Sequence, residues 1–142
     1  MTSQIKPPVI KADKDDNAQR VPVFWPVGFH GDGNLMRLVD ILAARVTQFI
    51  ETGTDSGSTV GYLARMYPHI TCYSCETDKQ TFEIAQLNLA DHPKNVCLQH
   101  AHSMDFLAAW YLATVPSLFW LDAHSDGWGC KLDEELAIVL ER

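Results

Sequence analysis

The chain has 142 residues, of which 46% are hydrophobic and 20% charged, and its formal net charge at pH 7 is −7. This composition supports one folded domain and excludes a largely disordered chain, while the acidic balance disfavours non-specific binding to nucleic acid or to anionic membranes. No apolar run reaches the roughly 18 residues of a membrane span, and the polar start of the chain has no secretory signal. The four cysteines suit a reducing compartment, so we expect a cytoplasmic protein.

The first 33 residues differ in composition from the rest of the chain. They are polar and mixed in charge at the start, then mix aromatic side chains with proline and glycine. This pattern predicts an N-terminal arm over residues 1–33, partly irregular, whose Phe24, Trp25 and Phe29 pack on the body of the protein. The folded domain is accordingly predicted to cover residues 34–142.

From residue 34 onward, helix and strand patterns alternate. Asn34 can cap a helix over residues 35–46, where apolar side chains recur at helical spacing. Strand patterns follow at 48–50, 70–75, 96–98 and 118–121, with helical patterns between them and a last helix near 132–140. The alternation predicts an α/β fold, a Rossmann-like parallel sheet with helices on both faces. Because ligands of such sheets bind beyond the carboxyl ends of the strands, those four ends are where a site is expected.

The first strand pattern ends in a loop with two glycines, Gly53 and Gly57. It has neither the G-x-G-x-x-G spacing of dinucleotide-binding folds nor the Gly-Lys-Ser/Thr of a phosphate loop. Glu51, at the end of the strand, would repel a pyrophosphate but can meet the ammonium group of an amino-acid-like ligand. The alternative is a plain strand–turn–helix connection.

The second and third strand patterns end in residues suited to a nucleoside. Glu76 follows Gly57 by 19 residues and can accept hydrogen bonds from the two hydroxyls of a ribose, although a glutamate near a helix N-terminus can also be a simple surface residue. After the third strand, His102, Ser103 and Met104 can flank a base. The alternative is that Ser103 only caps the next helix.

The fourth strand pattern ends in Asp122, followed closely by His124 and a glycine-rich loop. Asp122 can hold a ligand or substrate, and His124 has the pKa range of a general base near neutrality. Asp122, His124 and Asp126 are also metal-ligand types, but three such residues within five positions are a weak pattern. We therefore predict no metal site.

Together, the Glu51-Thr-Gly-Thr-x-x-Gly-Ser-Thr loop, Glu76, the Ser103 segment and the Phe-Trp-Leu-Asp-Ala-His run ending at His124 resemble the class I S-adenosylmethionine-dependent methyltransferases. The match covers about residues 47–140, and the Asp-Ala-His ending is most similar to the small-molecule O-methyltransferase branch. The resemblance implies S-adenosylmethionine as cofactor. By this resemblance the cofactor-binding residues are Glu51, Gly53, Thr54, Asp55, Gly57, Ser58, Thr59, Glu76, His102, Ser103 and Asp122, and the catalytic residues are His124 and Asp122.

The chain departs from the family pattern in three places. Asp55 stands where the commoner loop has a third glycine, and His102 stands where an aspartate often precedes the serine. The family's sheet usually continues beyond the fourth strand, whereas this chain ends after one more helix. With the family's strand order, 3-2-1-4, the Leu118–Leu121 strand would form an apolar edge. We therefore expect self-association through that edge, or a longer natural protein.

The sequence thus predicts an S-adenosylmethionine-dependent methyltransferase that O-methylates a small molecule and binds neither nucleic acid nor membranes. The alternative is a non-catalytic cofactor-binding or assembly domain that needs a partner chain. A nicotinamide-dependent oxidoreductase is disfavoured by the glycine spacing.

Overall fold

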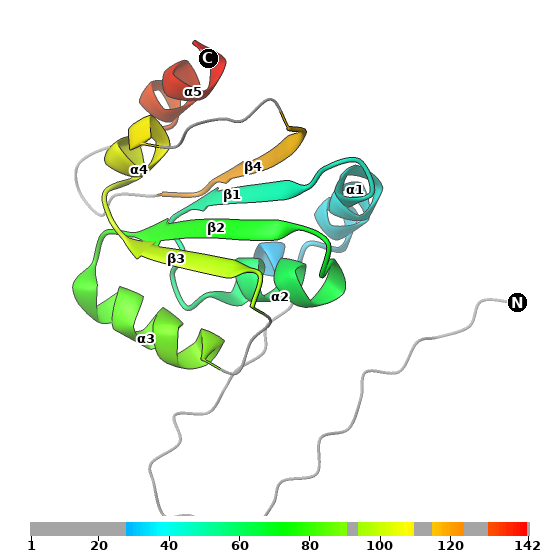
Figure 1. Ribbon diagram of the computed structural model, residues 1–142, viewed down its shortest axis with the longest axis horizontal. Helices are drawn as coiled ribbons and strands as arrows, with labels where there is room; N and C mark the ends of the chain where they lie inside the picture. The colour runs from blue at the N-terminus through cyan, green and yellow to red at the C-terminus, as the bar shows by residue number, and fades with distance from the viewer. Residues whose placement is uncertain (1–27, 91–93, 110–114, 124–130, 142) are drawn as a thin grey trace, which may run out of the picture.

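Four parallel strands form one sheet in the order β3-β2-β1-β4 (Figure 1). The computed structural model describes residues 28–90, 94–109, 115–123 and 131–141. The strands are β1 (Gln48–Thr52), β2 (Thr71–Glu76), β3 (Val96–His100) and β4 (Ser117–Leu121). In β1, Gln48 lies opposite Thr71 of β2 and Ser117 of β4, so the three strands end at nearly the same level. The predicted α/β class and strand order are confirmed.

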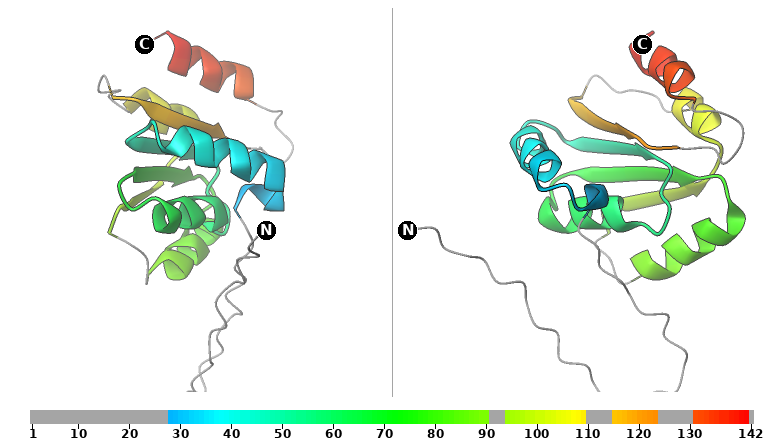
Figure 2. Two further views of the ribbon diagram at one scale, coloured as in Figure 1. Left: turned by 90° about the vertical axis from the view of Figure 1, so that its right-hand side faces the viewer. Right: turned by 180° about the vertical axis from the view of Figure 1, so that it is seen from behind.

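Helices cover both faces of this sheet (Figure 2). They are a short 3-10 helix η1 (Phe29–Gly31) and the α-helices α1 (Gly33–Ala43), α2 (Ser58–Met66), α3 (Lys79–Leu89), α4 (Ser103–Ala109) and α5 (Leu132–Leu140). Side chains of α1 and α2, joined by Leu89 at the end of α3, pack in one cluster, and those of α4 and α5 pack in another. Because both faces are covered, the central strand β1 is buried at all of its residues except Gln48, as in other buried parallel sheets.

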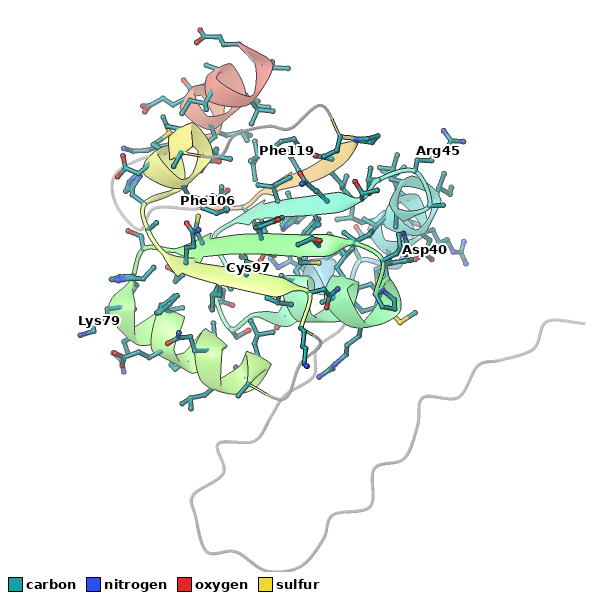
Figure 3. All side chains as sticks on the ribbon, in the orientation of Figure 1. Asp40, Arg45, Lys79, Cys97, Phe106 and Phe119 are labelled. Atoms are coloured by element: carbon teal, nitrogen blue, oxygen red, sulfur yellow. The ribbon has the colours of Figure 1, made fainter. Side chains whose placement is uncertain are left out.

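The two clusters of buried side chains follow the alternation of each strand. Phe49 points to the α1 and α2 side and its neighbour Ile50 to the α4 and α5 side, where Phe106 and Phe119 also lie (Figure 3). Cys72 and Cys75 likewise fall in different clusters, as their odd spacing requires. Burial raises the pKa of both thiols to about 12, so neither is ionised near neutrality.

Helix α1 is capped by Asp32, not by Asn34. The Asp32 carboxylate accepts hydrogen bonds from the backbone N–H groups of Asn34, at 2.8 Å, and Leu35, at 3.1 Å. The predicted cap is therefore wrong by two positions, because Asp32 has the extended backbone from which a side chain can reach the first turn. The helix ends at Ala43, three residues before the predicted end.

The described part of the N-terminal segment is attached to the domain. Phe29 is buried in the first cluster, as predicted, whereas Phe24 and Trp25 lie outside the described residues.

The strand β4 lies at one edge of the sheet. It pairs with β1 alone among the described strands, and its five residues are half-buried. None of the described helices is long and apolar enough to cross a membrane.

Candidate functional site

Two cavities lie at the carboxyl ends of the strands. The larger, of about 940 Å³, is lined from the ends of all four strands, and the smaller, of about 190 Å³, lies around the loop between β1 and α2. His30, Gly53, Asp55 and Asp122 line both, so the cavities adjoin. The carboxyl ends are the expected place for a ligand in this class of sheet. The volume of the larger cavity suits a drug-sized or nucleoside-sized ligand.

The residues predicted to bind a cofactor gather here. All of them line one or both cavities except Gly57, which has a positive φ of 86° at the N-cap of α2. The smaller cavity is lined by Glu51, Gly53, Thr54, Asp55, Ser58, Thr59 and Asp122 of this set, and the larger by Gly53, Asp55, Glu76, His102, Ser103 and Asp122. Of the two predicted catalytic residues, Asp122 lines both cavities, and His124 lies outside the described residues.

The loop after β1 closes directly on the end of β4. Gly53 has a φ of 77°, and a Cβ placed there would lie 2.6 Å from the carbonyl oxygen of Asp122 and 2.9 Å from the Cα of Ala123. Only glycine permits both the left-handed backbone and this approach. Asp55 also has a positive φ, of 48°. Because aspartate tolerates the left-handed region better than most residues, the chain keeps a glycine-like turn at the position where the family pattern has glycine.

Glu76 ties this loop to the end of β2. Its Oε2 accepts a hydrogen bond from the backbone N–H of Asp55 at 3.0 Å. Its Oε1 accepts from the N–H groups of Thr77, at 2.9 Å, and Asp78, at 3.0 Å. The carboxylate is thereby held in one orientation on the wall of the larger cavity. Oε2 accepts only one of these hydrogen bonds, so this oxygen has a lone pair left to bind a hydroxyl of a ligand.

Glu51 is a buried acid at the inner wall of the smaller cavity. Its side chain is 1% exposed, and its Oε2 accepts a 2.5 Å hydrogen bond from the Ser74 hydroxyl, which lies 2.6 Å from the Thr54 hydroxyl. Burial, together with the nearby carboxylates of Asp122 and others, raises the pKa of Glu51 to about 8, although the Ser74 hydrogen bond favours the ionised form. The side chain is therefore mostly protonated at neutral pH, and a cationic ligand beside it would favour its ionisation.

The end of β3 differs from the predicted detail. His102, not Ser103, caps α4, because its carbonyl oxygen accepts from the N–H of Phe106 at 2.9 Å and its Nδ1 accepts from the N–H of Met104 at 3.3 Å. Ser103 is the first helical residue and is 7% exposed. Both residues line the larger cavity, and the prediction that Ser103 caps this helix is wrong because His102 does so.

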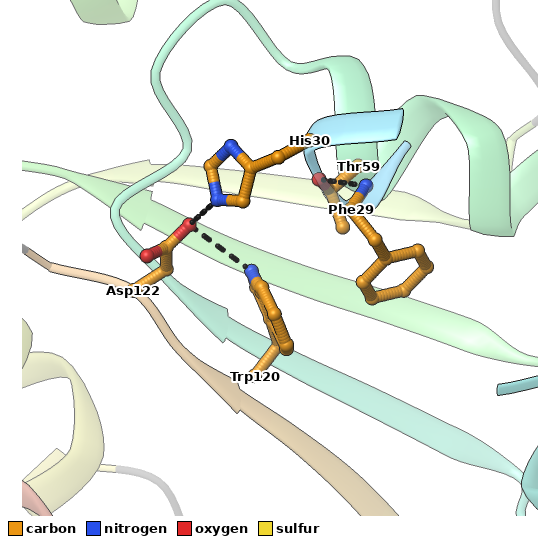
Figure 4. Close-up of polar contacts among 5 residues, drawn as sticks. All are labelled: Phe29, His30, Thr59, Trp120 and Asp122. Atoms are coloured by element: carbon orange, nitrogen blue, oxygen red, sulfur yellow. Dashed lines mark hydrogen bonds and ion pairs between the residues drawn. The ribbon is translucent and has the colours of Figure 1, made fainter. Parts of the chain in front are cut away.

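The carboxylate of Asp122 stands at the end of β4 beside two ring nitrogens. Its Oδ2 lies 2.8 Å from Nε2 of His30 and accepts a hydrogen bond from Nε1 of Trp120 at 3.3 Å (Figure 4). In the part of the chain that the structure describes, no group of three or more possible metal ligands comes together. His124 and Asp126, which the sequence pattern added to Asp122, lie outside that part.

His30 is a site residue that sequence reasoning missed. It belongs to η1, within the segment predicted as an arm, and reaches the site only because η1 folds over the end of β4. The one local signal was the pair of glycines, Gly28 and Gly31, that brackets Phe29 and His30. Lys131, at the start of α5, also lines the larger cavity and was not predicted.

No family model matches this chain, and no curated protein matches it. Among solved structures, the O-methyltransferase TomG of Streptomyces achromogenes, involved in tomaymycin synthesis and solved in complex with S-adenosylmethionine, aligns with a TM-score of 0.63. The alignment has 20% identity over 82% of this chain and 52% of TomG. The chain has the class I methyltransferase fold.

Two further solved structures, whose names differ in the reaction catalysed, have a similar fold. A candidate O-methyltransferase of Klebsiella pneumoniae aligns with a TM-score of 0.57 and 23% identity, over 69% of this chain and 45% of that one. A precorrin 8W decarboxylase of Methanobacterium thermoautotrophicum aligns with a TM-score of 0.54 and 17% identity, over 77% and 56%. This chain thus spans about half the length of each, and the methyltransferase fold alone does not fix the reaction.

Proposed function

We propose that this chain binds S-adenosylmethionine and belongs to a methyltransferase that acts on an oxygen atom of a small molecule. The observation that carries the proposal is the fixed Glu76 carboxylate on the wall of a cavity that all four strand ends line. The methyltransferase fold and its O-methyltransferase neighbours support it.

The cofactor's parts match the two cavities in chemistry. The ribose hydroxyls would donate to Glu76, and the adenine would lie beside His102 and Ser103 in the larger cavity. The methionine part would occupy the smaller cavity, which Thr54 and Ser58 line with hydroxyl groups. Bound there, S-adenosylmethionine would supply an electrophilic methyl group on a positively charged sulfur.

Glu51 would receive the ammonium group of the methionine part. An ammonium group near Glu51 stabilises the ionised carboxylate, so binding would lower the raised pKa of this acid. In a fraction of the molecules the carboxyl group would then lose its proton. The site would thus hold a neutral acid when empty and an ion pair when occupied. This avoids leaving an unpaired buried charge in the free protein.

Asp122 and His124 remain the proposed residues at the reacting end of the site. Methyl transfer needs an acceptor oxygen aligned with the methyl carbon and a group that takes up the acceptor's proton. Asp122 lines both cavities and would orient an acceptor or a base. His124 is the candidate for that base that the sequence position offers.

The experiment that tests the proposed function is calorimetric titration of the 142-residue chain with S-adenosylhomocysteine, the product form of the cofactor. We expect about one binding event per chain with a micromolar dissociation constant. A chain that is folded by circular dichroism but does not bind would contradict the proposal.

The exposed edge of the sheet favours a second candidate function. β4 pairs only with β1 among the described strands and carries the apolar run Leu118–Leu121. Such an edge can add a strand from another chain, which would suit a non-catalytic cofactor-binding or assembly domain. Cofactor binding without turnover, with turnover restored by a second chain, would favour this function over catalysis by the chain alone.

A further inference from the structure

The segment Gly28–Gly31 is held firmly over the carboxyl end of β4. Phe29 is 1% exposed and makes three edge-to-face aromatic contacts, the nearest with Trp120 at a centroid distance of 5.1 Å. Its backbone N–H donates a hydrogen bond to the Thr59 hydroxyl at 3.1 Å (Figure 4). The residue that follows, His30, therefore has a defined position and is not the end of a loose arm.

The backbone of this segment has an uncommon conformation. Phe29 and His30 have φ values of 57° and 54°, both in the left-handed region that residues other than glycine seldom adopt. Gly28 lies so close to Tyr62 that a Cβ there would be 2.9 Å from the Cβ of Tyr62. Strained conformations of this kind persist where the surrounding packing imposes them, and they concentrate at functional sites.

The strain presents the His30 ring to Asp122. Nε2 of His30 lies 2.8 Å from Oδ2 of Asp122, the oxygen that also accepts from Trp120. With Asp122 ionised, the neutral His30 ring has its hydrogen on Nε2 and donates a hydrogen bond from it to the carboxylate. The other ring nitrogen, Nδ1, then has a free lone pair. Figure 4 shows Nδ1 directed away from Asp122, and the side chain is 72% exposed, so this nitrogen is accessible. A histidine oriented by a carboxylate is the arrangement of many general bases.

The pair also stands where a base is needed. His30 and Asp122 line both cavities, the larger assigned above to the nucleoside and the smaller to the methionine part. In S-adenosylmethionine the sulfur that carries the methyl group joins these two parts. The pair therefore lies at the junction where the reacting methyl would face an acceptor.

We propose that His30 is the general base of methyl transfer and that Asp122 is its positioning residue, an inference that rests on the proposed function. The acceptor's O–H bond breaks and its proton passes to Nδ1 of His30 as the acceptor oxygen bonds to the methyl carbon. The electron pair of the broken S–C bond stays on sulfur, which becomes a neutral thioether. The Asp122 carboxylate stabilises the imidazolium that His30 becomes.

The first test measures His30 itself. Nitrogen-15 NMR of histidine-labelled full chain, with His30 assigned from the His30→Gln variant, gives the ring's tautomer and pKa in the free, S-adenosylhomocysteine-bound and S-adenosylmethionine-bound forms. Besides Asp122, the described ionisable groups that line a cavity with His30 are Glu51, Asp55, Cys75, Glu76, Asp78, His102 and Lys131. The two ligands differ by the methyl group on sulfur and by the positive charge that it brings.

We expect the neutral ring to carry its proton on Nε2, and its pKa to be lower with S-adenosylmethionine than with S-adenosylhomocysteine. The reason is that the positive sulfur opposes protonation of a nearby imidazole. If S-adenosylhomocysteine binds and the His30 signals do not respond to either ligand, His30 is not at the methyl group and the inference is overturned, while the proposed function stands. If a folded chain binds neither ligand, the proposed function itself fails.

The second test measures turnover on an acceptor found by screening phenols and monosaccharides with the wild-type chain. His30→Gln should lower kcat about 100-fold or more, the usual contribution of a general base, with little change in KM or in affinity for S-adenosylhomocysteine. His69→Gln is the matched control, because His69 bonds the carbonyl oxygen of Ala43 and lines neither cavity. Loss of kcat in His124→Gln but not in His30→Gln would overturn the inference and assign the base to the residue first predicted from the sequence.

Discussion

Replacing Glu76 with alanine tests the ribose contact most directly. Both oxygens of this carboxylate are fixed by backbone N–H groups at 2.9 to 3.0 Å, and the residue lines the larger cavity, so the free protein already holds the carboxylate in place for the ribose. Hydrogen bonds to a charged acceptor contribute roughly 1.5–3 kcal/mol each, but water replaces them in the variant, so we expect a net loss of about 1–3 kcal/mol. At 298 K this raises the dissociation constant about 5- to 150-fold.

Calorimetry with S-adenosylhomocysteine measures this change, and Glu83→Ala is the control. Glu83 is an exposed glutamate on α3 that pairs only loosely with Lys79, at 3.9 Å, and lines neither cavity. A second ligand, the 2′,3′-dideoxy form of S-adenosylhomocysteine, separates direct from indirect effects. Because it lacks the hydroxyls, Glu76→Ala should weaken its binding much less. Unchanged affinity for the parent ligand, or an equal loss for both ligands, would refute the direct contact.

Three further predictions follow from the same geometry. The pKa of Glu51 is raised from its ordinary value of 4.5 to about 8 in the folded protein, so between these values the folded chain holds a proton that the unfolded chain releases. The free energy of unfolding should therefore fall as the pH rises from about 5 to 8. Urea unfolding at pH 5, 7 and 9 should show this decline, and Glu51→Gln should abolish it. Gly53→Ala should destabilise the fold by about 1–3 kcal/mol in thermal unfolding, because its Cβ would meet the Asp122 carbonyl, whereas Gly33→Ala, with open space around its Cβ, should cost nothing. If the Leu118–Leu121 edge pairs with a second copy of the chain, sedimentation at rising concentration should show self-association, and a monomer at every concentration would contradict it.

Much of the fold could be predicted because each element carries its own periodic pattern. The apolar run at Leu118–Leu121 and the helical spacing around Val60 depend only on near neighbours in the chain, so the helices and strands could be predicted from them. The strand order, in contrast, came from the resemblance to the methyltransferase family. Choices between adjacent residues of similar chemistry could not be made in this way. Asp32 and Asn34 are both good caps, and only the backbone conformation of the structure distinguishes them.

The position of the site could be predicted from the sequence, but the contacts within it could not. Residues at the strand ends, such as Glu76 and Asp122, were found because topology brings those ends together. The burial of Glu51 and its bond to Ser74 depend on packing across strands, which no single stretch of sequence reveals. His30 was missed because its partner lies 92 positions away and its left-handed backbone leaves no pattern in the sequence.

That separation of 92 positions also determines when the site can form during synthesis. As the chain is made from its N-terminus, His30 and Phe29 emerge long before β4 exists, and β1, β2 and β3 can pair with one another first. The aromatic contact of Phe29 with Trp120 and the pairing of His30 with Asp122 are among the contacts of longest sequence separation in the described fold. Such contacts close the largest loops and form late. A nascent chain would therefore fix Glu76 against the loop after β1 before it completes the histidine–aspartate pair.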